Sequence, residues 1–283
     1  DVLGSRGLGD VYKRQVMDAL VENDIMPDYM IGVSAGAAYG VSMASKQPRR
    51  NLDVLMKYRN DKRYLGLSNM IDKDNKSIYG LEFSYETIPN ELNLFDYDAF
   101  KQYKGDFYCV VTNLLTGQPE YMKYTGDDRT NTVLKATCAL PMLFPPIIIN
   151  DVPYMDGGLS DSIPYLKAIE DGCDRIIVVL TRQSGYTKTT SRSTKAIAYS
   201  YRNQYPKLTE TMLTRASRYN ESLKGLDQYV KEGRIITIQP TTSKGFSRLE
   251  KDKNKILSMY NDGYNQCYEL PVSYTHLTLP TIR

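Results

Sequence analysis

The sequence predicts an α/β protein in which a largely parallel sheet is flanked by helices. Short apolar runs, which are typical of buried strands, alternate along the chain with segments whose apolar residues have helical spacing. No internal repeat or low-complexity tract interrupts this alternation. The length is enough for one sizeable domain, or for one domain with an extension.

Each element is predicted from its own pattern. Apolar runs predict strands at residues 29–31, 107–111, 175–180 and 234–238, and helical spacing predicts helices at residues 16–22, 37–45, 132–140, 165–170 and 209–232. Asp171-Gly172 predicts the end of the fourth helix. Residues 147–155 predict two short strands joined at Asn150-Asp151, which would place Asp156 at a strand end. The polar residues 183–195 predict a loop.

The sequences of the two terminal segments indicate that these segments have a foreign origin. Residues 10–15 can be encoded by gat gtg tat aag aga cag, and the complementary strand of that stretch, in another frame, encodes residues 272–277. Both ends resemble read-through of a sequencing adapter, so we take residues 1–15 as a non-native leader and residues 271–283 as a non-native tail. The expected organisation is then a main domain at residues 16–181. A helical extension with one further strand, at residues 182–270, is expected to pack on it.

The composition excludes several kinds of protein. Without the two predicted foreign ends, Lys+Arg falls from 36 to 32 and Asp+Glu from 33 to 31, so the formal net charge falls from +3 to +1. A near-neutral chain gives no electrostatic case for a nucleic-acid partner. No apolar run approaches the roughly 20 residues that cross a bilayer, which predicts a soluble or peripheral protein. The cysteine pattern described next is what favours a cytoplasmic location. Free thiols are expected, because the four cysteines are widely spaced: Cys109, Cys138, Cys173 and Cys267.

A candidate nucleophile lies in Gly32-Val33-Ser34-Ala35-Gly36. An apolar strand precedes Ser34 and small residues begin a helix after it, which is the strand-turn-helix context of a Gly-x-Ser-x-Gly elbow. The helix N-terminus would also favour negative charge at the serine oxygen. Two other interpretations are a chance match and a phosphate-binding turn.

A candidate base lies in Asp156-Gly157-Gly158. A carboxylate at a strand end can accept the serine proton and return it to the leaving group, and the two glycines allow a close backbone approach. An ordinary turn is the alternative. The only histidine, His276, lies in the predicted foreign tail, so a Ser-Asp pair is favoured over a histidine triad.

Several ordered blocks resemble the bacterial patatin-like phospholipases. They are residues 31–37 around Ser34, residues 135–141 with 144–146, and residues 154–158 around Asp156 with 163–164. The likeness covers nearly all of residues 16–270, and residues 247–250 with 259–264 resemble the C-terminal region of one bacterial branch. Such an ordered set is far more specific than any single motif.

The resemblance implies a lipid acyl hydrolase on a three-layer α/β/α fold with a mostly parallel central sheet. By that resemblance Ser34 is the nucleophile and Asp156 the general base, an acyl-enzyme is the intermediate, and residues 16–181 form the catalytic domain. The family also has a Gly-Gly-Gly-x-Arg/Lys-Gly loop that supplies the oxyanion hole before a helix matching residues 16–20. Here Gly4, Gly7 and Gly9 fall in the predicted leader without the family spacing. No oxyanion residue is therefore assigned, and catalysis by this chain is expected to be impaired.

Other functions remain open at this point. The same dyad would serve an acyltransferase or a thioesterase, and a hydrolase-like fold would serve a non-catalytic lipid-binding or regulatory protein. No metal constellation is present in the sequence, so neither a cofactor nor calcium dependence is expected. Lys188, Arg192 and Lys195 could contact anionic headgroups, although a solvated loop is the favoured interpretation.

Overall fold

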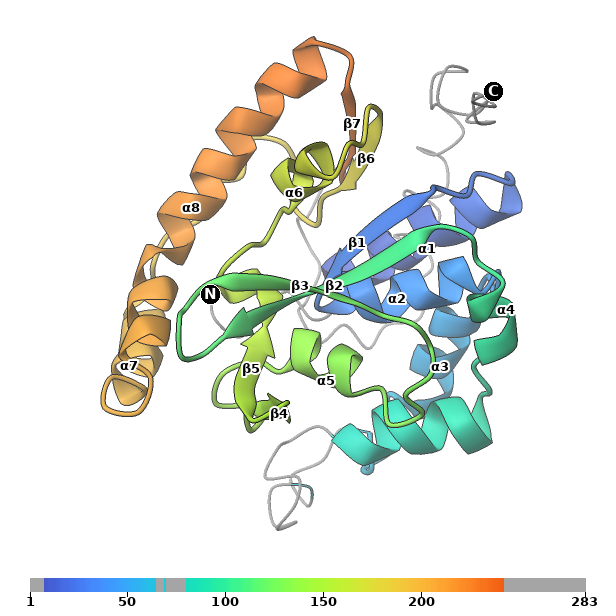
Figure 1. Cartoon of the computed structure of the whole chain (residues 1–283), viewed down its shortest axis with the longest axis horizontal. Coiled ribbons are helices and arrows are strands. Elements are labelled where there is room, and N and C mark those ends of the chain that lie inside the picture. The colour runs from blue at the N-terminus through green and yellow to red at the C-terminus, as the bar shows by residue number, and fades with distance from the viewer. Residues whose placement is uncertain (1–7, 65–68, 70–79, 242–283) are drawn as a thin grey trace.

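A computed structural model describes residues 8–64, 69 and 80–241, and it confirms the predicted α/β class (Figure 1). The strands are β1 (Tyr29–Val33), β2 (Asp106–Asn113), β3 (Pro119–Lys123), β4 (Ile147–Ile149), β5 (Val152–Asp156), β6 (Ile176–Val179) and β7 (Ile235–Ile238). The α-helices are α1 (Leu8–Glu22), α2 (Ala35–Ala44), α3 (Arg50–Tyr58), α4 (Tyr97–Lys101), α5 (Thr132–Cys138), α6 (Tyr165–Glu170), α7 (Arg192–Ser200) and α8 (Pro206–Lys231). A π-helix, η2 (Phe83–Leu92), and a 3₁₀-helix, η3 (Gly157–Leu159), complete the described elements.

The strand pairs are partly parallel and partly antiparallel. β1 pairs with β2 in parallel, and β6 pairs with β7 in parallel, as the sequence predicts. β2 also pairs antiparallel with β3 and β5, and β5 pairs antiparallel with β4. The β2–β3 and β4–β5 pairs are hairpins, and a short connection can only return the chain in the opposite direction. The sheet around β2 is therefore mixed, and the parallel pairs are those whose strands are joined through helices.

Helices cover both faces of the strands, which gives the expected three layers. On β6, Ile177 and Val179 pack with residues of α1, whereas Ile176 and Val178 on the opposite face pack with residues of α6 and α8. This division follows from the alternation of side chains along a strand. Figure 1 shows α8 on one side of the strands and α1 and α2 on the other.

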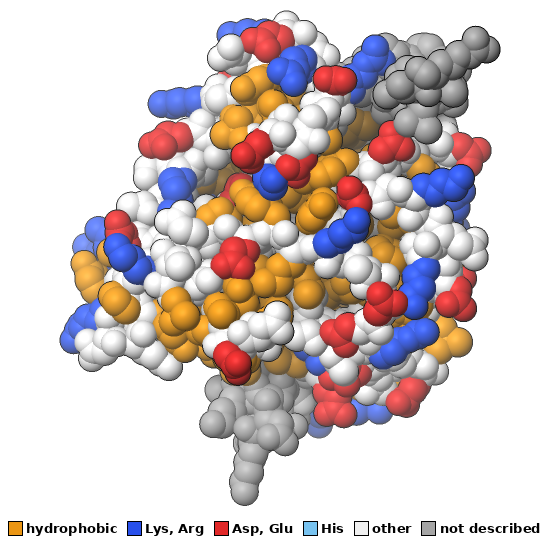
Figure 2. Space-filling model, in the orientation of Figure 1, with side chains coloured by type: hydrophobic (Ala, Val, Ile, Leu, Met, Phe, Trp, Pro, Cys, Tyr) orange, Lys and Arg blue, Asp and Glu red, His pale blue; other side chains and the backbone are white. Residues whose placement is uncertain are grey.

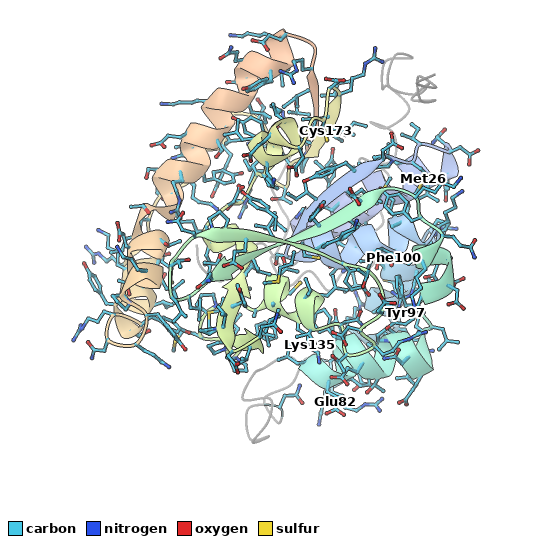
Figure 3. All side chains as sticks on the ribbon, viewed as in Figure 1. Met26, Glu82, Tyr97, Phe100, Lys135 and Cys173 are labelled. Atoms are coloured by element: carbon cyan, nitrogen blue, oxygen red, sulfur yellow. The ribbon has the colours of Figure 1, made fainter. Side chains whose placement is uncertain are left out.

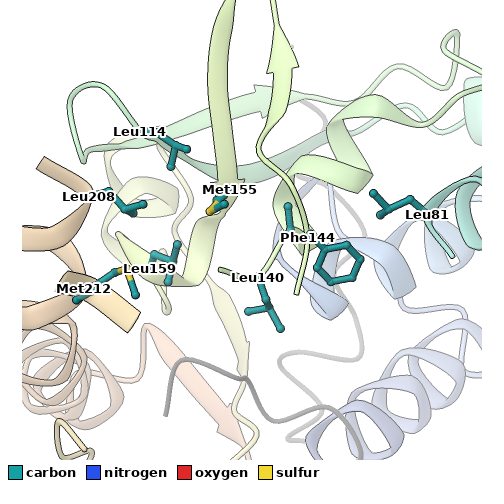
Figure 4. Close-up of a cluster of buried hydrophobic side chains, with 10 residues drawn as sticks. Leu81, Leu114, Leu140, Phe144, Met155, Leu159, Leu208 and Met212 are labelled. Atoms are coloured by element: carbon teal, nitrogen blue, oxygen red, sulfur yellow. The ribbon is translucent and has the colours of Figure 1, made fainter. Parts of the chain in front are cut away.

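A buried apolar cluster lies beside the end of β5 (Figure 4). Met155, the last residue before Asp156, has no exposed surface, and Leu159 of η3 is 1% exposed. Leu208 and Met212 of α8 pack against them and are also fully buried. The cluster therefore fixes the backbone on both sides of Asp156.

The expected element boundaries need three corrections. The first helix begins at Leu8 rather than at residue 16, so it includes residues of the predicted leader. The loop predicted at residues 183–195 ends at Ser191, whose hydroxyl accepts a hydrogen bond from the N–H of Thr194 and so caps α7. The helix predicted at residues 132–140 ends at Cys138, because Pro141 disfavours a helical conformation at the residue before it.

The sequence did not predict α3, α4, α7, β3 or η2. Pro89 lies inside η2, and a proline within a helical pattern normally indicates a break. Contacts from another helix hold η2 in place, because Lys135 of α5 forms an ion pair with Glu86 and the Asn131 amide donates to the carbonyl of Tyr85 at 2.7 Å. Figure 3 shows Lys135 next to this part of the chain.

Within the described residues, no helix has the length and apolar character needed to cross a bilayer. Lys, Arg, Asp and Glu side chains are interspersed over the face shown in Figure 2, with hydrophobic side chains between them. That face carries no extended patch of a single charge sign.

Candidate active site

Ser34 lies at a tight turn between β1 and α2. Its backbone has φ 55° and ψ −126°, a region that residues with side chains rarely adopt and that costs on the order of 1–3 kcal/mol. Its carbonyl oxygen accepts hydrogen bonds from the N–H groups of Ala37 and Ala38 at 2.9 and 3.1 Å, so the helix begins immediately. This strained turn between a strand and a helix is the geometry of a nucleophile elbow.

The two glycines of the elbow have different roles. A Cβ on Gly32 would lie 2.4 Å from Cα of Ala37, so only glycine lets the strand pass so close to the helix. A Cβ on Gly36 would meet only the Lys13 ammonium, at 3.5 Å, which is ordinary contact. Packing therefore requires Gly32 but not Gly36 in this structure.

Thr137 of α5 holds the turn from behind. Its hydroxyl accepts a hydrogen bond from the Ser34 N–H at 2.9 Å and donates to the carbonyl of Val110 at 2.6 Å. Thr137 has no exposed surface. The hydroxyl thus connects the elbow to the neighbouring strand β2, because it satisfies the N–H of the half-buried Ser34 and the carbonyl of the fully buried Val110.

Asp156 is the last residue of β5 and is 3% exposed. Its N–H donates to the carbonyl of Ala139 at 2.9 Å, and its carbonyl accepts from the Thr112 hydroxyl at 2.8 Å. One carboxylate oxygen, Oδ1, accepts from the N–H of Gly158 at 2.8 Å. The carboxylate is therefore fixed in one orientation by its own loop.

The glycines after Asp156 bring this carboxylate to the elbow. A Cβ on Gly157 would lie 2.1 Å from the carbonyl oxygen of Val110, which forces glycine at this position. A Cβ on Gly158 would lie 3.1 Å from Oδ1 of Asp156 and 3.5 Å from Cγ1 of Val33, the residue before Ser34. The Asp156 carboxylate and the side chain of the residue next to the candidate nucleophile therefore both lie close to the Cβ position of Gly158.

Arg215 of α8 also reaches this site. Its Nε donates to the Gly158 carbonyl at 2.6 Å, and its charge interacts favourably with that of Asp156. Burial lowers the pKa of the Arg215 guanidinium. An arginine from the C-terminal part of the chain therefore lies beside the candidate base.

Lys188 is not the solvated lysine that the sequence favours. Its ammonium lies 4.1 Å from the centre of the Tyr219 ring, and two hydrogen bonds with Asn220 of α8 hold its backbone. Burial, and then the charges of Arg215 and Arg182, lower the pKa of Lys188 to about 7, although Asp156 acts in the opposite direction. The sequence contains no local signal for this environment, because it arises from contacts with a distant helix.

The structure thus brings the elbow and the Asp-Gly-Gly turn together, from positions far apart in the sequence. Thr137 and Arg215 are the contributors that sequence reasoning did not assign. Thr137 lies inside the block at residues 135–141, so the signal was present without an assigned role. No group of three or more His, Cys, Asp or Glu side chains that could hold a metal ion occurs in the part of the chain that the structure describes.

Comparisons with known proteins give two family matches. The family model described as patatin-like phospholipase matches residues 4–169, and one described as a domain of unknown function, DUF6363, matches residues 205–270. The first match includes residues 4–15, so the foreign origin of the leader stays a prediction from the sequence.

Curated relatives match this chain at low identity. Lysophospholipase nte1 of Aspergillus terreus is 28% identical over 189 residues, which are 63% of this chain and 11% of that protein. The uncharacterized protein YjjU of Escherichia coli is 25% identical over 190 residues, which are 63% of this chain and 49% of that protein. The chain thus spans from about a tenth to about half of the length of these relatives. Because the first family match covers more than half of the sequence, the chain belongs to the patatin-like phospholipase family.

Proposed function

We propose that this protein hydrolyses carboxylic esters of lipids, with Ser34 as the nucleophile and Asp156 as the general base. The observation that carries the proposal is the strained backbone of Ser34, in an elbow whose Val33 side chain lies close to Gly158 in the loop of the oriented and buried Asp156 carboxylate. Backbone strain of this kind persists where the surrounding structure enforces it, which is common at active sites. The family and the relatives named lysophospholipase support a lipid ester as the substrate.

In the proposed reaction, the Asp156 carboxylate accepts the Ser34 hydroxyl proton while Oγ attacks the ester carbonyl. The tetrahedral intermediate collapses, and Asp156 returns the proton to the departing alcohol, which leaves an acyl group on Ser34. Water then attacks the acyl-enzyme with Asp156 again as the base, and the fatty acid is released. The N-terminus of α2 directs backbone N–H groups toward the serine, which favours negative charge there.

Turnover by this chain is expected to be slow. Loss of one oxyanion donor typically costs about 100-fold to 1,000-fold in kcat, and we propose that the leader has replaced the loop that supplies these donors. Lys13, which belongs to that leader, lies next to Gly36 of the elbow. Peripheral contact with lipid and a cytoplasmic location both stay predictions.

Covalent labelling tests the proposal without requiring fast turnover. A fluorophosphonate probe should modify Ser34, as identified by peptide mass spectrometry, and Ser34→Ala should abolish both labelling and any release of fatty acid from a lysophospholipid. Ser217→Ala is the matched control, since Ser217 is an exposed serine on α8. Labelling that survives Ser34→Ala, or a chain that neither labels nor hydrolyses after a Gly-Gly-Gly-x-Arg-Gly loop is introduced before Val16, would rule the proposal out.

A further inference from the structure

Helix α8 contributes a cation to the loop that carries the candidate base. The patatin-like match ends at residue 169, whereas Arg215 lies in the part matched as a domain of unknown function, residues 205–270. The Nε of Arg215 donates to the Gly158 carbonyl at 2.6 Å, and the Gly158 N–H donates to Oδ1 of Asp156 at 2.8 Å. One residue of the loop therefore contacts both the arginine and the carboxylate.

The guanidinium and the carboxylate also lie near the same point in space. A Cβ on Gly158 would lie 3.6 Å from Nη2 of Arg215 and 3.1 Å from Oδ1 of Asp156. These two atoms are therefore at most about 7 Å apart, in a part of the protein where opposite charges interact more strongly than in water. Among the neighbouring groups, Asp156 stabilises the charge of Arg215 most, ahead of Tyr186 and Tyr219.

The main contribution of Arg215 is its charge rather than its hydrogen bond. The Ser162 hydroxyl also donates to the Gly158 carbonyl, at 2.8 Å, so this carbonyl keeps a partner without the arginine. Asp156 is 3% exposed, and burial alone favours the protonated form of a carboxylate. Nearby positive charge favours the ionised form, and only an ionised carboxylate can accept a proton. The arginine therefore bears directly on the role proposed for Asp156.

Lys188 is a second cation whose charge interacts with that of Asp156. Burial, followed by the charges of Arg215 and Arg182, lowers the pKa of Lys188 to about 7, so this ammonium is only partly charged near neutral pH. A guanidinium, in contrast, stays charged over the whole physiological range. Of these two neighbours of Asp156, Arg215 is thus the one that supplies a constant positive charge.

Arg218, on the same face of α8, is engaged elsewhere. Its Nη2 donates to the Leu159 carbonyl at 2.7 Å, and the charges of Asp161, Glu210 and Glu221 all favour its own charge. Asp156 is not among the groups that act on it. Arg218 therefore supports the same loop without serving as the counter-charge of the candidate base, which makes it a matched control.

We propose that Arg215 is a positioning residue for the candidate base, which holds the Asp156 loop through Gly158 and keeps the buried carboxylate ionised. This role rests on the proposed function, because it concerns the ability of Asp156 to accept the Ser34 proton. It also gives the second family match a part in the reaction. Residues of that domain of unknown function would complete a site whose nucleophile and base both lie in the patatin-like match.

The pH dependence of probe labelling at Ser34 tests this role. Arg215→Met removes the charge and the donors from a side chain of similar length. The acidic midpoint of the labelling rate should then move upward by about one pH unit or more, because the carboxylate holds its proton more strongly. Arg215→Lys retains the charge and should keep the midpoint within about 0.3 pH unit of the parent chain, although loss of the Nε–H should slow labelling at every pH.

Two controls accompany this profile. Arg218→Met removes an arginine from the same helix face and should leave the midpoint unchanged, even if it lowers stability. The comparison is repeated in chains that carry Lys188→Met, so that titration of this lysine near neutral pH does not contribute. If Arg215→Met moves the midpoint no further than Arg218→Met does, Arg215 does not set the ionisation of Asp156.

Urea unfolding at two pH values tests the pairing without any labelling. At about pH 7.5, Arg215→Met should raise the unfolding equilibrium constant by about tenfold more than it does at about pH 5. The reason is that a buried carboxylate without its counter-charge binds a proton more readily in the folded state than in the unfolded chain, so acid restores stability. In chains that carry Asp156→Asn, the effect of Arg215→Met should be the same at both pH values.

The two measurements separate this role from the proposed reaction. A pH-independent effect of Arg215→Met on unfolding would show that its charge is not coupled to Asp156, whatever Ser34 does. A pH-dependent effect in a chain whose Ser34 never labels would contradict the proposed reaction, and with it the positioning role, while leaving the pairing of Arg215 with Asp156 intact.

Discussion

At the scale of single residues, one hydroxyl connects the candidate nucleophile to the sheet. The Thr137 hydroxyl is both acceptor for the Ser34 N–H and donor to Val110, so its loss removes one hydrogen bond from each of these backbone groups, of which Val110 is fully buried. A buried group left unsatisfied costs about 1–3 kcal/mol. The strained turn at Ser34 depends on such support, because its own backbone conformation is unfavourable.

Thr137→Val is therefore expected to lower the free energy of unfolding by about 2–4 kcal/mol and to slow probe labelling of Ser34. Urea unfolding and a labelling time course measure the two effects. Thr137→Ser retains the hydroxyl and should restore labelling, even though it loses a buried methyl group. If Thr137→Val labels at the rate of the parent chain under conditions where both are folded, Thr137 does not position the nucleophile.

The sequence contains local motifs for the proposed catalytic residues but none for the residues that surround them. Ser34 and Asp156 occur in short motifs that also contain glycines. The structure gives a steric reason for Gly32 and Gly157, because a Cβ at either position would clash with neighbouring backbone atoms. Arg215 has no such local pattern, since its role depends on where a distant helix packs. The same holds for Lys188, whose burial comes from Tyr219 and not from the polar loop in which it lies.

At the scale of elements, α1 contains a segment that fits its surroundings poorly. Gln15 has no exposed surface, and neither end of its amide has a hydrogen-bond partner among the described residues. About one turn further along the same helix, Ala19 and Leu20 belong to a buried apolar cluster that also contains Tyr12. The unpaired amide of Gln15 is therefore expected to destabilise the fold, although Tyr12 of the same predicted leader packs in the core.

Gln15→Met tests that interpretation, because methionine has a similar volume and no group that requires a partner. We expect the free energy of unfolding to rise by about 1–3 kcal/mol, since the penalty for two buried unpaired groups is removed. Gln102→Met, at an exposed position, should change stability by less than about 0.5 kcal/mol. A Gln15→Met chain that is less stable than the parent would show that the amide is satisfied after all.

Elements were predictable where one pattern dominated. The strands β1, β2, β6 and β7 are short apolar runs, and the β4–β5 hairpin turns at Asn150 and Asp151, both of which have positive φ. In contrast, η2 contains Pro89 and is held by side chains of α5, so its stability comes from tertiary contacts. A single proline determines where α5 ends, and a single serine cap determines where α7 begins.

At the scale of the whole molecule, the C-terminal elements and the candidate active site form one structural unit. β7 pairs with β6, and α8 contributes Leu208 and Met212 to the cluster that contains Met155 and Leu159. Among the described residues, elements after residue 181 therefore pack directly on elements before it. Order in the Asp156 loop should depend on α8, even though the two are far apart in sequence.

Met212→Ala is the test of that dependence. Truncation of a fully buried methionine leaves a cavity and costs about 2–5 kcal/mol. Because Met212 packs with residues on both sides of Asp156, amide hydrogen exchange should become faster in peptides that cover β5 and η3 as well as in α8. Val230→Ala, near the end of the same helix and 38% exposed, should affect α8 alone. If Met212→Ala also speeds exchange only within α8, the helix does not order the loop that carries the candidate base.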